Sequence, residues 1–223
     1  MNKRTIILLG LIILLSVGAG IVLLVAKRKQ PEVAAPTKTE VVKLVDEAVI
    51  SPIGSYDGTA LWYFNSSGRL FRVNLDGSGL TEFPLPALPG GKLTKVFWPQ
   101  TGSDFIAQTG TSMGEIRNYY DNAQKKYVQL PDNILSLDWM PDGRRIIYVW
   151  KAGDNTQALK IANADSSGFS AITDLFWPDY IVKISPNAES VLLYRSPAQA
   201  EVNKIYKVNL RTKQFEPVVE AGR

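Results

Sequence analysis

Residues 134–173 decide the fold, and they read ILSLDWMPDGRRIIYVWKAGDNTQALKIANADSSGFSAIT. Short apolar or alternating runs are separated here by turn-forming residues, and the four runs are 134–139, 145–150, 158–162 and 170–173. Proline fixes φ and glycine permits positive φ, so Pro141-Asp142-Gly143 and the turn at 165–168 suit the tight corners of antiparallel hairpins. The stretch therefore predicts four short antiparallel strands.

The same unit occurs four times along the chain. The residue that follows the first strand corner is Gly58, Gly102, Gly143 and Ala188, and the spacings are 44, 41 and 45 residues. The residue that ends the third strand is Asp76, Asp121, Asp165 and Arg211, and the spacings are 45, 44 and 46 residues. A period of this length with four strands is typical of a propeller blade. We therefore predict an all-β domain over residues 47–220, with four blades of about 44 residues each.

Two short patterns in these units resemble a known family. Residues 139–148 and 182–187 resemble the SPDG repeat of TolB-type, WD-repeat-like propellers, and residues 163–168 and 74–79 look like the N-x-D-G-S-G turn of that family. The resemblance covers about residues 47–219 and is weakest in the second unit. It implies a propeller fold and a habit of binding proteins, and it implies no shared catalytic residues.

Propellers of that family usually have more than four blades. The four units therefore form either an unusually small ring or an open arc of a larger propeller, and we favour the arc. The outer faces of an arc need capping, because a repeat array exposes apolar surface at its two ends. The strand at 60–64 is as apolar as the interior strands, so we expect little capping at the first blade.

An apolar segment precedes the repeats. The 22 positions from Thr5 to Ala26 carry no charge, and a helix of that length reaches about 33 Å, enough to cross a hydrocarbon core about 30 Å thick. A cleaved signal peptide is the alternative, because residues 17–19 are small. Cleavage there would leave the apolar residues 20–26 at the new N-terminus. We therefore predict a tail at 1–4, a transmembrane helix at 5–26 and a linker at 27–46.

The orientation of the span is set weakly by charge, because basic residues flank it on both sides. A short tail favours a single-pass protein with its C-terminal domain outside the cytoplasm. Five of the 25 basic residues flank the span and all 21 acidic residues follow it, so the rest of the chain carries a net charge of −1. Nucleic-acid binders carry basic patches, so we expect no nucleic-acid partner.

Residues 110–114 match the G-x-S-x-G pattern of serine hydrolases. That chemistry needs a histidine to take the serine proton, and the chain has no histidine and no cysteine. The same absence removes the commonest zinc ligands. We therefore predict no catalytic residues, no metal site and no cofactor, and we read residues 110–114 as a loop. Asp76, Asp121 and Asp165 recur at turns, where their carboxylates are expected to accept turn N–H groups rather than bind Ca²⁺.

The five tryptophans are expected mainly to pack between blades. Trp177 and Asp179, in the linker between the third and fourth units, are the candidate surface binding residues. The favoured function is a membrane-tethered module at the cell envelope that binds protein or peptide through blade loops. One alternative is a non-catalytic propeller domain of a larger membrane-bound hydrolase, similar to prolyl oligopeptidases. The third is a carbohydrate-binding propeller.

Overall fold

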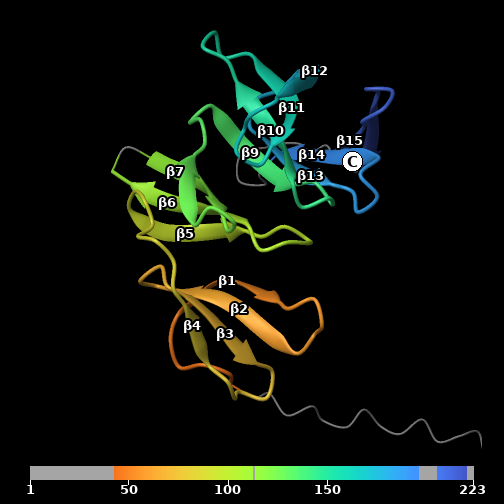
Figure 1. Cartoon of the computed structure of the whole chain (residues 1–223). Coiled ribbons are helices and arrows are strands. Elements are labelled where there is room, and N and C mark those ends of the chain that lie inside the picture. Colours follow the sequence, from red (N-terminus) through yellow and green to blue (C-terminus); the bar gives the residue numbers. More distant parts are fainter. Residues whose placement is uncertain (1–42, 113, 196–204, 220–223) are drawn as a thin grey trace, which may run out of the picture. The chain divides into compact units, whose positions relative to one another are not determined.

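The computed structural model describes residues 43–112, 114–195 and 205–219 (Figure 1). These residues form four antiparallel sheets, each built from four consecutive strands. The strands are β1 (Val49–Gly54), β2 (Ala60–Asn65), β3 (Leu70–Asn74), β4 (Thr81–Phe83), β5 (Lys92–Phe97), β6 (Phe105–Thr111), β7 (Gly114–Asp121), β8 (Lys126–Gln129), β9 (Ile134–Trp139), β10 (Arg145–Lys151), β11 (Gln157–Asn163), β12 (Ser170–Leu175), β13 (Tyr180–Ile184), β14 (Ser190–Arg195), β15 (Ile205–Asn209) and β16 (Phe215–Val219). The prediction of four four-stranded blades is confirmed.

The corners between the first two strands of each blade lie where the repeat places them. Gly58, Gly102, Gly143 and Ala188 all adopt positive φ, with values of 66°, 98°, 65° and 57°. Glycine reaches this region without strain, whereas alanine does so at a cost. The Ala188 N–H donates to the Ser185 carbonyl oxygen at 2.9 Å, which closes the same corner in the fourth blade.

The second strand of each of the first three blades is buried on both faces, with neighbouring residues pointing to opposite sides of the sheet. In β6, Phe105 packs against the first sheet and Ile106 packs against the third. In β10, Ile146 faces the second sheet and Ile147 faces the fourth. Apolar clusters thus join the blades in sequence order. Among the described residues, none of these clusters joins the fourth blade to the first.

Two tryptophans connect neighbouring blades through their indole N–H groups. Trp98 donates to the Ser51 carbonyl oxygen of β1 at 2.6 Å, and Trp139 donates to the Phe97 carbonyl oxygen of β5 at 2.9 Å. Trp139 is almost completely buried. The expectation that tryptophans pack between blades is confirmed at these two positions.

The first sheet is capped on the face turned away from the second sheet. Tyr63, Phe71 and Val73 lie on this face, and Leu44 and Val45 pack against them. In the same region, Glu47 accepts hydrogen bonds from the Tyr63 hydroxyl at 2.9 Å and from the Asn65 side-chain amide at 3.1 Å. Burial, together with the Glu47 carboxylate, raises the pKa of Tyr63 to about 12. The expectation of little capping at this end is therefore wrong, because residues that precede the first strand cover its apolar face.

The predicted span from Thr5 to Ala26 lies outside the described residues. Within the described part of the chain, no helix is long and apolar enough to cross a membrane.

Candidate functional site

Two grooves lie at equivalent places in the first and third blades. In an antiparallel four-stranded sheet, the turn between the second and third strands and the end of the fourth strand lie at the same end of the sheet, measured along the strands. We call this end, with the linkers that leave from it, the linker edge; in these two blades it comprises residues 66–69, 84–91, 152–156 and 176–179. The opposite edge carries the turns between the first and second strands and between the third and fourth.

The groove in the third blade, here called the Trp177 groove, is a hollow of about 630 Å³ lined by residues 154–157 and 174–178. Its lining residues come from the β10–β11 turn, the start of β11, the end of β12 and the linker that runs from β12 to β13. Phe176 is 75% exposed and Trp177 is 54% exposed. The Phe176 ring lies 5.2 Å from the ring of Phe215 in β16, so the linker rests against the outer strand of the fourth blade. The prediction that Trp177 is a surface aromatic is confirmed.

The polar lining of this groove includes two carboxylates, Asp154 and Asp174, and the side-chain amide of Gln157. Gln157 begins β11 and is 8% exposed, and its Oε1 atom has no hydrogen-bond partner among the described residues. Asp154 accepts from both the N–H and the hydroxyl of Thr156, at 3.0 and 2.6 Å. The hydrogen bond from the Thr156 hydroxyl has the larger effect, and the two bonds together hold the pKa of Asp154 below its ordinary value. The carboxylate is therefore ionised at neutral pH. Asp174, at the end of β12, is exposed.

Asp179, the second residue predicted for this site, does not line the groove. It is exposed and adopts a φ of 63°, a conformation that aspartate tolerates better than most residues. It turns the chain between the exposed linker and the buried Tyr180. The structure therefore brings Trp177 together with Gln157 and Asp154, which the sequence did not single out. The signal that could have found them is the repeat, because it places the turn at 152–156 and the start of β11 beside the linker that follows β12.

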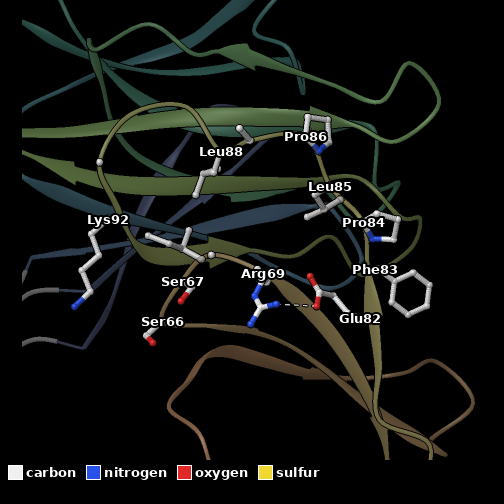
Figure 2. A pocket seen from close by; sticks show the side chains of 14 residues that line it. Ser66, Ser67, Arg69, Glu82, Phe83, Pro84, Leu85, Pro86, Leu88 and Lys92 are labelled. Carbon is white, nitrogen blue, oxygen red and sulfur yellow. Dashed lines mark hydrogen bonds and ion pairs between the residues drawn. The ribbon is translucent and has the colours of Figure 1, made fainter.

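The groove in the first blade, here called the Pro84 groove, is a hollow of about 490 Å³ lined by residues 66–69, 82–88 and 91–93. Figure 2 shows it between the β2–β3 turn and the proline-rich linker to β5. Two of its lining residues form a salt bridge, with the Arg69 guanidinium 3.0 Å from the Glu82 carboxylate. Lys92 adds a second basic side chain to the lining. Its charged groups therefore include both signs, unlike those of the Trp177 groove.

The segment that matches the serine-hydrolase pattern has a structural role. Gly110 and Thr111 end β6, Gly114 begins β7, and Thr111 pairs with Gly114, so much of the segment predicted to be a loop is strand at a tight hairpin. Gly91 lies directly against the carbonyl oxygen of Gly110, so closely that a side chain at Gly91 would collide with it. In the described part of the chain, no three acidic side chains gather where they could hold a metal ion.

The recurring turn aspartates act as the sequence predicted. Asp76 accepts from the N–H and hydroxyl of Ser78, and Asp165 accepts from the same groups of Ser167. Asp121 accepts from the Gln124 N–H at 2.9 Å.

Comparisons with known proteins support the fold. No protein-family model matches the chain, and no curated protein matches it. Among solved structures, TolB from Acinetobacter baumannii is similar with a TM-score of 0.50 and 12% identity, over 78% of this chain and 44% of that one. A chain of the nidogen–laminin complex is similar with a TM-score of 0.53 and 8% identity, over 78% of this chain and 66% of that one. The chain thus spans less than two thirds of the length of each, and at these identities the likeness shows the fold alone. The resemblance to TolB-type propellers is confirmed at that level.

Proposed function

We propose that this chain is a non-enzymatic interaction module, held at the membrane of the cell envelope by Thr5 to Ala26, whose domain lies outside the cytoplasm and binds a protein or peptide at its linker edge. The observation that carries the proposal is the Trp177 groove. Two large aromatic side chains stand exposed beside a hollow that the carboxylates of Asp154 and Asp174 also line. Exposed aromatics next to a recess are typical of protein-binding surfaces.

The size of the aromatic contribution is sufficient to make Trp177 an anchor. Fully burying a large apolar side chain is worth about 1.5–3 kcal/mol, and tryptophan is among the residues most enriched at binding hot spots. Phe176 already contacts Phe215, so the linker is held in place before a partner arrives. A surface that is already ordered loses less conformational entropy on binding.

Two further observations support binding rather than catalysis. The chain has neither histidine nor cysteine, so the commonest general base and the most reactive thiol nucleophile are absent. The solved structure of the nidogen–laminin complex is an assembly of proteins, and one of its chains shares the propeller fold.

The test is photo-crosslinking in intact membranes. A photoreactive phenylalanine analogue replaces Trp177 in the full chain, and a matched variant carries it at Leu75, which is 51% exposed in the turn between β3 and β4 on the opposite edge. We expect a protein or peptide adduct from position 177 and little from position 75. Equal adducts from both positions, or none from position 177, would contradict the proposal.

A further inference from the structure

The two grooves differ in charge, although they occupy equivalent places in their blades. In the Pro84 groove, Arg69 pairs with Glu82, so the carboxylate on the fourth strand is neutralised locally. In the Trp177 groove, the corresponding fourth strand contributes Asp174, and the facing loop contributes Asp154. No lysine or arginine lines this groove, and among the described residues no salt bridge involves either carboxylate.

The two carboxylates also make the Trp177 groove a place where a ligand can donate hydrogen bonds. Asp154 and Asp174 provide carboxylate oxygens at its sides. The Oε1 atom of Gln157 is too deeply buried for a ligand to reach it, so the two carboxylates are the acceptors that a ligand meets. The groove therefore fits a ligand with several N–H donors and a positive charge.

The aromatic side chains narrow the choice of cation. The indole of Trp177 is the side chain that binds cations best through its ring face. Arginine combines a flat guanidinium that stacks on such a ring with five N–H donors arranged as a fork. Lysine offers a compact charge that stacks less well. A sugar would also use the ring, and its hydroxyls would donate to the carboxylates, but it carries no positive charge to offset theirs.

We propose that the Trp177 groove is the receptor for an arginine side chain of the partner. In this arrangement the guanidinium stacks on Trp177 and donates to the carboxylates of Asp154 and Asp174. This assignment rests on the proposed function, because it takes the partner to be a peptide or a protein segment.

The experiment is a selection of phage-displayed random peptides on the full chain in lipid nanodiscs. It compares the wild type with Asp174→Asn, with Asp154→Asn and with Glu82→Gln, the matched control in the Pro84 groove. Asparagine keeps the size of aspartate and its acceptor oxygen, so the cap on Thr156 survives in Asp154→Asn. Circular dichroism and thermal melting are used to check that all four proteins are folded.

We expect the wild type and Glu82→Gln to enrich peptides that share an arginine. Each aspartate substitution should weaken the binding of those peptides at least about tenfold, because it removes a charge-assisted hydrogen bond to the guanidinium. Replacing the shared arginine by lysine in the enriched peptides should also weaken their binding. Enriched peptides without a shared arginine, or with affinity unchanged in both aspartate variants, would overturn the arginine assignment and leave peptide binding standing. Failure of the wild type to enrich any peptide would overturn both. Binding to glycans on an array that requires Trp177 but not Asp174 would identify a sugar, rather than arginine, as the ligand of the groove.

Discussion

Replacing Trp139 by phenylalanine should destabilise the domain by about 2–4 kcal/mol. The substitution removes the N–H that donates to the Phe97 carbonyl oxygen across the boundary between the second and third blades. Loss of one partner of a buried hydrogen bond costs about 1–3 kcal/mol. Trp139 is only 3% exposed, so the space left by the smaller ring adds about 1 kcal/mol, at the low end of the range for large-to-small core substitutions.

The assay is urea unfolding of residues 43–223, followed by circular dichroism. With a slope of about 2 kcal/mol per molar urea, the midpoint should fall by about 1–2 M. Trp150→Phe is the control, because Trp150 is only partly buried and the Nζ atom of Lys160 lies 4.5 Å from the centre of its ring. This substitution should change the free energy of unfolding by less than about 1 kcal/mol. Equal losses in the two variants, or a loss below about 0.5 kcal/mol in Trp139→Phe, would refute the view that the indole hydrogen bond joins the blades.

Three other predictions concern a carboxylate, a glycine and the anchor. Hydrogen bonds to its carboxylate lower the pKa of Asp57 from its ordinary 3.8 to about 2, and the bond from the Ser55 hydroxyl has the largest effect. The stability that the ionised carboxylate provides is complete above pH 3.8 and is lost as the pH falls towards 2. NMR titration of its carboxyl should give the low midpoint, and Asp57→Asn should lose less stability across that window than the wild type. Gly91→Ala should cost about 1–3 kcal/mol by thermal unfolding, because its Cβ would meet a backbone carbonyl of β6, whereas Gly153→Ala, with open space around it, should be near neutral; equal effects would contradict the close approach. The full chain should stay in the membrane after a carbonate wash if Thr5 to Ala26 spans it; release at full mass would exclude the anchor, and release at lower mass would indicate cleavage.

The blades could be predicted from the sequence because their signals are local. Each corner is specified within a few residues by proline, glycine or a capping aspartate, as at Asp142 and Gly143. Asp142 accepts from the N–H of Arg144 at 2.9 Å, which is a bond within the turn itself. Local signals that recur at one period also fix the number of strands in each unit.

The groove could be predicted only in part, because it depends on how distant segments pack. Trp177 was identifiable as a bulky residue beside a proline in a linker, whereas Asp179 was selected only for its closeness to Trp177 in sequence. Gln157 is buried by the packing of β11 and the neighbouring linker, and no local pattern reports that. The cap formed by Leu44 and Val45 was missed for a similar reason, since these residues lie at the end of a polar, proline-containing stretch.

The affinity of Trp177→Ala for the peptides that the wild type enriches tests the proposed function most directly. Truncation of a central aromatic anchor costs about 2 kcal/mol or more, which is a loss of about thirtyfold in affinity. The side chain is more than half exposed, so thermal stability should stay close to that of the wild type. We predict a dissociation constant at least about thirty times higher with an unchanged melting temperature. An unchanged dissociation constant in a folded Trp177→Ala protein would contradict binding at this groove.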